Sequence, residues 1–422
     1  MTTTTLDNGM QIMLNDTKGT DTVSVLVLVR VGSRYEYPEI NGASHFIEHL
    51  MFKGTKRRMT AQHISRALDS IGADYNAFTS KNITGYYIKV AKKHASLAVD
   101  ILQDMLFHSV FDAEEMDRER QVIIEEINMY QENPMMHVED LLETTMFDGS
   151  TLGWEIVGSH KTMLGMTRDA VLDFYQKYYQ PSNMVLSIAG NIPASLKKDI
   201  EKRFGKKKTS REEFDVFEGI VSTSQKEISI GLQHKPTKQI QLALGFPSYG
   251  IDDDRNAALK LLGIILGGNM SSRLFVEVRE RRGLAYFVRA SNTAYEDIGN
   301  FMIRAGLDAS RLKLATKTIL DELRKIKKDG VSAKELKEAK TFLQGKMAIS
   351  LEDSFHTAQW YANQKMFHTR VRSPKAVLKR IEKVSRKDVL AVANEILDKK
   401  AMSVAAVGPF KTTAQLKKAM GI

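Results

Sequence analysis

Two histidines four residues apart, His45 and His49, enclose Glu48 in the segment "HFIEHLMFKGT". In an α-helix, residues at i and i+4 lie on one face one turn apart, so both imidazoles can point at one ion. Imidazole nitrogen is a good zinc ligand, and Glu48 stands at the rim of the same face, where a carboxylate can act as a base. The pattern is short enough to arise by chance, so two ordinary surface histidines are the alternative reading.

A carboxylate that could complete the ligand set lies in the segment 111–132, "FDAEEMDRERQVIIEEINMYQE". This segment reads as a helix with Asp112 as its N-cap. Glu119 and Glu126 are seven residues apart and therefore share a face of that helix. We expect Glu126 to be the third ligand and Glu119 to lie close to the histidines. Glu125, about 100° away around the helix, is the competing ligand.

The elements that must position these residues occur twice along the chain, in the same order. Each half begins with an apolar strand and a helix, continues with an alternating polar and apolar stretch, and ends with two helices. In the first half the helix of His45 is followed by a second helix, 60–73. The other elements of the first half are the strand 22–33, the alternating stretch 75–91 and the two closing helices 94–107 and 111–132. In the second half they are the strand 238–248, the helix 254–268, the alternating stretch 286–307 and the two closing helices 311–330 and 332–352.

This repetition predicts two tandem homologous α+β domains, residues 1–212 and residues 213–422. The boundary is placed in the polar segment 205–225, "GKKKTSREEFDVFEGIVSTSQ". The alternating stretches indicate in each domain a mostly antiparallel sheet with helices packed on one face.

The repeat also serves as an internal control for the metal hypothesis. Aligning the helix 112–126 with the segment 332–346 places Ala339 opposite Glu119 and Lys346 opposite Glu126. The second half has no histidines in its first helix. A residue needed only for folding should recur in both halves, so the polar set of the first half is assigned to chemistry.

The motifs together resemble those of the pitrilysin family of zinc metallopeptidases, the inverzincins. The resemblance covers nearly the whole chain and is greatest to short bacterial processing-peptidase-like proteins and the β subunit of the mitochondrial processing peptidase. Its motifs, in family order, are "LDNGMQIML", "GSRYE", "NGASHFIEHLMFKGT", "NAFTSKN", "ERQVIIEEI", "GGNMSSRLF" and "RERRGLAY". The family fold implied is the two-domain architecture predicted above.

The resemblance implies roles for the residues of the first half. It makes His45, His49 and Glu126 the ligands of one Zn²⁺ per chain, Glu48 the general base, and Glu119 the upstream glutamate of the family pattern. Another divalent ion stays possible, because two histidines and a glutamate do not select zinc by affinity alone.

The resemblance also implies contacts with a peptide substrate. Asn76 and Ala77 match the strand edge that holds the substrate backbone, and Phe78 matches the neighbouring pocket. In the second half, Arg279 and Tyr286 match the pair that reaches over the active site to the substrate carbonyl.

The activity implied is that of a zinc metalloendopeptidase that hydrolyses small or unfolded peptides inside a closed chamber. Such a chamber requires a homodimer, or a heterodimer with an inactive relative. The alternative is a non-proteolytic peptide-binding or scaffold subunit, which would be expected to have lost the metal residues.

The composition and charge of the chain narrow the kinds of site and partner that it can have. The chain has no cysteine, which excludes disulfides and thiolate metal sites. Its formal net charge of +10 comes from basic residues interleaved with acids and matches no nucleic-acid-binding motif, so we expect no nucleic-acid partner. No signal sequence or long apolar run is evident, and we expect a cytoplasmic protein without a membrane partner.

Overall fold

The computed structural model describes residues 1–209, 214, 219 and 227–422. The described residues form two compact units. Unit 1 contains Met1–Ile127, the described part of Trp154–Phe217, and Met347–Val371; unit 2 contains Asn128–Gly153, the described part of Glu218–Lys346, and Arg372–Ile422. The predicted boundary between residues 212 and 213 lies outside the described residues, as does most of the polar segment 205–225.

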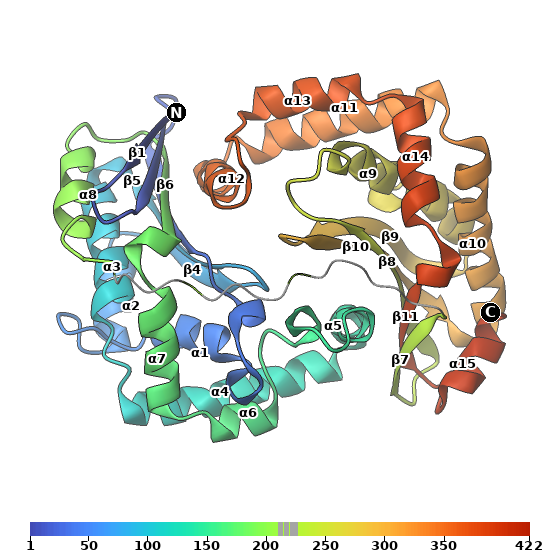
Figure 1. The fold of residues 1–422 in the computed structure, drawn as a ribbon, viewed down its shortest axis with the longest axis horizontal. Helices are drawn as coiled ribbons and strands as arrows, with labels where there is room; N and C mark the ends of the chain where they lie inside the picture. Colours follow the sequence, from blue (N-terminus) through green and yellow to red (C-terminus); the bar gives the residue numbers. More distant parts are fainter. Residues whose placement is uncertain (210–213, 215–218, 220–226) are drawn as a thin grey trace. The chain divides into compact units, whose positions relative to one another are not determined.

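Unit 1 is built on a six-stranded sheet (Figure 1). Neighbouring strands are antiparallel except for one parallel pair, β2 with β6. In sheet order the strands are β1 (Thr2–Thr5), β2 (Gln11–Asp16), β6 (Met184–Gly190), β3 (Thr22–Val29), β5 (Thr84–Ala91) and β4 (Asp74–Thr79). The strand β4 is an edge strand, since only β5 pairs with it.

The larger core of unit 1 lies between one face of this sheet and a set of helices. On β3, the valines at alternate positions from Val23 to Val29 point into this core. The helices of the unit are α1 (Ala43–Leu50), α2 (Ala61–Asp69), α3 (Ala95–His108), the first part of α4 (Ala113–Glu132), α6 (His160–Gly165), α7 (Arg168–Tyr178) and α8 (Leu196–Phe204). Short 3-10 turns at Ser33–Tyr35 and Pro38–Ile40 precede α1.

The opposite face of the sheet is covered by a helix from late in the sequence, α12 (Ser354–Phe367), which packs on β3 and β6. Leu26 and Leu28 of β3 point to this side and form a second core cluster with Ala358 and Ala362 of α12. Both faces of β3 are therefore buried, which explains why its sequence is apolar at every position from Val25 to Val29 rather than alternating.

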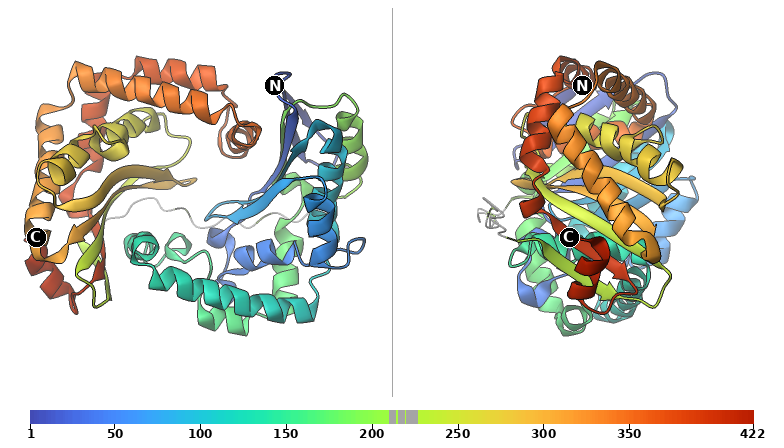
Figure 2. Two further views of the ribbon diagram at one scale, coloured as in Figure 1. Left: turned by 180° about the vertical axis from the view of Figure 1, so that it is seen from behind. Right: turned by 90° about the vertical axis from the view of Figure 1, so that its right-hand side faces the viewer.

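Unit 2 contains a five-stranded sheet with one parallel pair, β7 with β11, and otherwise antiparallel neighbours (Figure 2). In sheet order its strands are β7 (Ser229–His234), β11 (Ser403–Gly408), β8 (Gln239–Tyr249), β10 (Ile298–Asp308) and β9 (Ala285–Ala294). Its helices are α5 (Pro134–Met146), α9 (Asn256–Gly263), α10 (Leu312–Asp329), most of α11 (Ala333–Ser350), α13 (Pro374–Lys383), α14 (Arg386–Ile396) and α15 (Thr413–Met420), with π-helical turns at Ile264–Gly268 and Phe275–Glu280.

The helix α5 comes from the first half of the sequence but packs on β7, β8 and β11 of unit 2. Val138 and Leu142 of α5 share a core cluster with Ala243, Ala405 and Val407 of the sheet. Each sheet thus receives one covering helix from the other half of the sequence. The predicted packing of helices on one face of each sheet describes the main layer of helices. It does not include the exchange of α5 and α12 between the two halves.

The predicted repeat is confirmed in its main elements, because the strands and helices expected in both halves are present in the predicted order. Asp112 accepts hydrogen bonds from the N–H groups of Glu114 and Glu115 and so caps α4, and Ser332 accepts one from Glu335 at the start of α11. The predicted strand 22–33 is shorter than expected and ends at Val29. Within the described residues, every helix is too short or too polar to cross a bilayer.

Candidate metal centre

The helix that carries the two histidines starts at a tightly constrained turn. Gly42 adopts φ = +100°, and a Cβ at this position would lie 2.9 Å from the carbonyl oxygen of Val157. The carboxylate of Glu36 accepts hydrogen bonds from the backbone N–H groups of Gly42 (2.8 Å) and Ser44 (2.7 Å) and from the Asn41 side chain (3.0 Å). Glu36 therefore satisfies donors at the start of α1 and places a carboxylate at the positive end of the helix.

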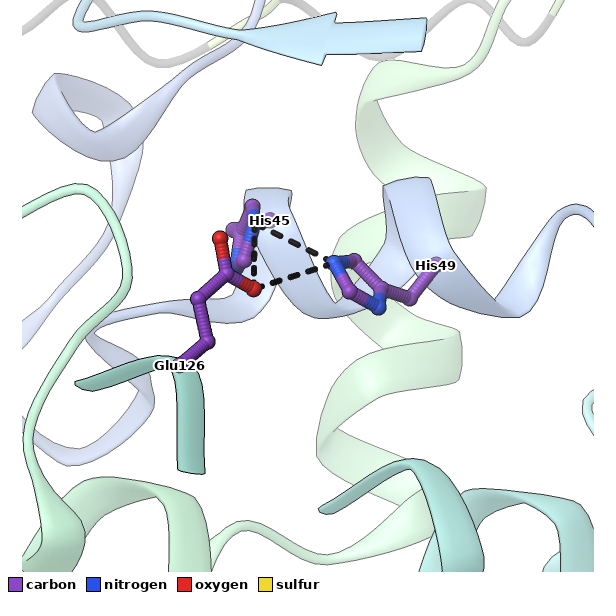
Figure 3. A group of neighbouring side chains, drawn as sticks. All are labelled: His45, His49 and Glu126. Atoms are coloured by element: carbon purple, nitrogen blue, oxygen red, sulfur yellow. Dashed lines mark hydrogen bonds and ion pairs between the residues drawn. The ribbon is translucent and has the colours of Figure 1, made fainter. Parts of the chain in front are cut away.

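His45 and His49 of α1 and Glu126 of α4 converge on one point (Figure 3). The two Nε2 atoms are 3.2 Å apart, and Oε2 of Glu126 lies 3.7 Å from Nε2 of His45 and 3.5 Å from Nε2 of His49. Among the described residues, this is the one group of three or more His, Asp or Glu side chains whose ligand atoms are close enough to share an ion.

These spacings fit a tetrahedral zinc ion. Metal–ligand bonds of about 2.0–2.1 Å separate the corners of a tetrahedron by about 3.3–3.4 Å, close to the three separations between the ligand atoms. Three protein ligands leave the fourth corner open, which is the arrangement of catalytic rather than structural zinc sites. The residues present therefore fit a zinc ion.

The protonation state of His45 also suits a ligand. Burial, and then the neighbouring His49, lower the pKa of His45 from 6.5 to about 3. The imidazole is consequently neutral at physiological pH and offers a lone pair without first losing a proton. Its Nδ1 atom is buried and has no hydrogen-bond partner among the described residues.

Glu119 lies on the same face of α4 as Glu126 and contacts the other ring nitrogen of His49. Its Oε1 is 3.6 Å from Nδ1 of His49, and its Oε2 forms an ion pair with Lys53. Burial alone would raise the pKa of Glu119, but its contacts with His49 and Lys53 outweigh burial and lower it. Glu119 is thus an anion that orients the His49 ring and makes its Nε2 a stronger donor to a metal.

Glu48 lies one position before His49 and is half-buried. Its Oε2 accepts a hydrogen bond of 2.5 Å from the hydroxyl of Thr79 on β4. Burial raises the pKa of Glu48 above the usual range of a glutamate, although the Thr79 hydrogen bond and His49 act in the opposite direction. A glutamate with a raised pKa is a better proton acceptor near neutral pH than an ordinary surface carboxylate.

The competing ligand, Glu125, is exposed to solvent and does not belong to the converging group. Consecutive residues of a helix point about 100° apart, so α4 cannot direct Glu125 and Glu126 to the same side. The geometry brings Glu126, and not Glu125, to the two histidines.

The three predicted substrate-strand residues lie on β4, the free edge of the sheet in unit 1. Asn76 is exposed, and its side chain accepts a hydrogen bond of 2.9 Å from the backbone N–H of Ala77. The Phe78 ring lies across Gly85 of the neighbouring strand and packs against the cluster under α12. Phe78 therefore has a clear packing role, while its role in a substrate pocket stays a prediction.

Arg279 and Tyr286 lie in unit 2, at the second π-helical turn and at the start of β9. The guanidinium carbon of Arg279 is 5.8 Å from the centre of the Tyr286 ring, so the two side chains are neighbours. Tyr286 is 77% exposed, which is unusual for a large aromatic side chain and suits a residue that contacts a ligand. That the pair reaches the metal centre stays a prediction, because the two belong to the other unit.

The structure adds three residues that the sequence analysis did not assign: Glu36, Lys53 and Thr79. Glu36 and Lys53 stand in quoted motifs, "GSRYE" and "HFIEHLMFKGT", and Thr79 in "NAFTSKN". Their partners are distant in sequence or are backbone groups, so only the fold shows that Thr79 meets Glu48 and Lys53 meets Glu119.

Two family models match consecutive parts of the chain. Residues 11–160 match the model described as insulinase (peptidase family M16), and residues 165–343 match the model described as the peptidase M16 inactive domain. The first match contains His45, His49 and Glu126, and the second contains Ala339, which stands opposite Glu119 in the repeat.

Curated relatives match along most of their length. An uncharacterized zinc protease of Bacillus subtilis, YmxG, is 40% identical over 354 residues, which are 83% of this chain and 84% of the relative. An uncharacterized zinc protease of Streptomyces coelicolor is 35% identical over 97% of this chain and 89% of its own. One of Rickettsia bellii is 33% identical over 96% of both chains.

Solved structures share the fold. A protease from Helicobacter pylori superimposes with a TM-score of 0.92 over 97% of this chain and 99% of its own, at 24% identity. A putative M16-like peptidase from Alicyclobacillus acidocaldarius gives a TM-score of 0.85 at 20% identity, over 96% of this chain and 97% of its own. These structures show the shared fold, and the family models and curated relatives show that the chain belongs to peptidase family M16, the insulinase family, which is the pitrilysin family that its motifs indicated.

Proposed function

We propose that the protein is a zinc-dependent endopeptidase with one catalytic metal ion per chain. The observation that carries this proposal is the convergence of His45, His49 and Glu126 at tetrahedral spacing, with Glu48 beside them. When bound, zinc supplies Lewis-acid chemistry and acidifies a water molecule towards neutral pH.

The residues of the chain divide the remaining work. Glu48, with its raised pKa and its hydrogen bond from Thr79, accepts the proton of the attacking water and passes it to the amine that leaves. Glu119 and Lys53 keep the ring of His49 oriented. Tyr286, with Arg279 beside it, is proposed to donate a hydrogen bond to the oxyanion that develops on the peptide carbonyl.

The peptide is proposed to bind as an added strand along the free edge of β4. An edge strand has unpaired backbone groups that an extended peptide can use. The N–H of Ala77 is satisfied by the Asn76 side chain, which can turn away when a substrate carbonyl takes its place. Asn76 would then keep this donor from pairing wrongly when no substrate is present.

We further propose that two copies of the chain enclose a chamber that admits small or unfolded peptides, and that the enzyme acts in the cytoplasm. A homodimer is the simpler assembly, because this chain already holds every metal residue that the family pattern requires. Size-exclusion chromatography with light scattering on the purified chain tests this: a dimer supports the chamber, and a monomer with full activity contradicts it.

The activity is tested by digesting a mixed peptide library with the purified chain and reading the products by mass spectrometry. Internal cleavage that a chelator abolishes and zinc restores supports the endopeptidase. No cleavage by a zinc-loaded chain, combined with saturable peptide binding, supports a non-proteolytic peptide-binding subunit instead.

A further inference from the structure

Unit 2 contains a cavity to which the proposed peptidase chemistry gives no role. It lies between α10, the segment that follows α14, and α15, above β8. Figure 1 shows α10 and α15 beside each other near the C-terminus. The volume of the cavity is about 730 Å³, within the range of about 300–1,000 Å³ that is typical of small-molecule sites.

The floor of the cavity is apolar. Its side chains come from a strand, two helices and the segment after α14, so the hollow is formed by packing and not by one flexible loop. The apolar lining residues are Phe246, Leu320, Leu323, Leu397, Met402 and Met420. All except Leu320 are buried in the protein core, and they form a fixed surface against which an apolar group can pack.

The rim of the cavity is strongly basic. The lining contains one acid, Asp398, and six bases: Lys313, Lys317, Arg324, Lys327, Lys328 and Lys399. Asp398 is already engaged, since its carboxylate accepts a hydrogen bond from the backbone N–H of Lys400. The rim therefore presents an excess of positive charge over an apolar floor.

Three of these six bases have an ion-pair or hydrogen-bond partner among the described residues. Lys317 and Arg324 both pair with Asp321, and Lys327 donates a hydrogen bond of 2.9 Å to the carbonyl oxygen of Leu397. Lys313, Lys328 and Lys399 form no ion pair with any residue that the structure describes. Lys313 and Lys328 lie at opposite ends of α10, about 22 Å apart along its axis. Because Lys327 bonds Leu397, Lys399 lies at the Lys328 end, so Lys328 and Lys399 are the charges to which one head group could provide a partner.

The basic residues on α10 follow the helix periodicity. Lys313, Lys317, Arg324 and Lys327 are separated by multiples of three to four residues and fall on one face, with Leu320 between them. A basic helix face that serves only to contact solvent does not need an apolar cavity beside it. The arrangement matches a ligand with two parts, one apolar and one anionic.

We propose that this cavity binds a small amphiphilic anion, with its apolar body on the floor and its carboxylate, sulfonate or phosphate head group beside Lys328 and Lys399. Fatty acids and aromatic acids both combine an apolar body with an anionic head group. The site is independent of the proposed peptidase function.

Isothermal titration of the full-length chain with dodecanoate, below its micelle concentration, tests the proposal. We expect one saturable site per chain, and affinity that rises by up to roughly fourfold for each methylene added from octanoate to dodecanoate. An aromatic sulfonate of similar size distinguishes the two sources: tighter binding of dodecanoate assigns a linear chain, and tighter binding of the sulfonate assigns a ring body. The dodecyltrimethylammonium cation should bind at least tenfold more weakly than dodecanoate.

Charge-reversal variants localise the site. Lys328→Glu combined with Lys399→Glu should weaken dodecanoate binding at least tenfold, whereas Lys337→Glu, an exposed lysine on α11, should leave it unchanged. Leu320→Trp, which fills the hollow from its half-buried side, should also weaken binding while circular dichroism shows an intact fold.

Three results would overturn the proposal. They are the absence of saturable binding to the unmodified chain, equal binding of the cationic and anionic amphiphiles, and equal weakening by Lys337→Glu and by the double variant.

Discussion

The hydrogen bond between Thr79 and Glu48 gives the sharpest test of how the fold tunes the proposed base. The hydroxyl of Thr79 donates to Oε2 of Glu48 at 2.5 Å, and this bond exists fully only when Glu48 is a carboxylate. The variant Thr79→Val removes the donor and keeps the branched side chain on β4. The metal residues keep all their contacts.

The size and sign of the effect follow from this bond. A hydrogen bond to a charged group contributes about 1.5–3 kcal/mol, and a half-buried site favours the lower value. About 1.5 kcal/mol corresponds to roughly a tenfold change in the equilibrium between the carboxylate and the carboxylic acid. Because the Thr79 bond lowers the pKa of Glu48, its loss raises that pKa further.

The expected result is a loss of activity that depends on pH. Below the pKa of Glu48, kcat/KM should fall about tenfold, because about ten times less of the enzyme carries the carboxylate. At higher pH the loss should largely disappear. The assay is kcat/KM for one fluorogenic peptide between pH 5 and pH 9, with zinc content measured on each sample.

A matched control is Thr3→Val in the exposed edge strand β1, which should have the profile of the unmodified enzyme. A loss in Thr79→Val that is equal at all pH values would refute the assigned role, and so would a shift of the acidic limb to lower pH.

Three further predictions concern the metal and the residues around it. Glu126→Ala should lose stoichiometric zinc by elemental analysis, whereas Glu125→Ala should retain it; retained zinc in the first variant would move the ligand role elsewhere. Glu36→Ala leaves buried donors unpaired at the start of α1 and should lower the free energy of unfolding by about 2–4 kcal/mol in denaturant titration, while exposed Glu39→Ala should change it little. Tyr286→Phe should lower kcat by about a hundredfold with unchanged unfolding, and unchanged kcat would remove Tyr286 from the mechanism.

The main elements around the site could be predicted because their signals are local. A pair of histidines at helical spacing, two glutamates seven apart and a repeat of element order need no knowledge of the fold. The same geometric rule that favoured Glu126 over Glu125 is visible in the structure, where α4 turns Glu125 to solvent.

The features that could not be predicted depend on contacts between distant parts of the chain. Nothing in the residues of α12 indicates that it covers β3 and β6, because a helix with a weak apolar stripe can pack in several places. The roles of Glu36 and Thr79 depend on a turn and on a strand pairing that bring them to α1. Single polar residues of this kind carry no periodic signal.

The central claim is that this chain holds a metal with His45, His49 and Glu126 and uses Glu48 as the base. It is tested most directly by measuring zinc content and peptide cleavage on the same preparation of Glu48→Gln, beside Glu125→Gln as a control. We predict that Glu48→Gln retains one zinc per chain and cleaves peptides at least a hundredfold more slowly, while Glu125→Gln equals the unmodified enzyme. Cleavage by Glu48→Gln at the unmodified rate, or an unmodified chain that binds no zinc, would contradict the claim.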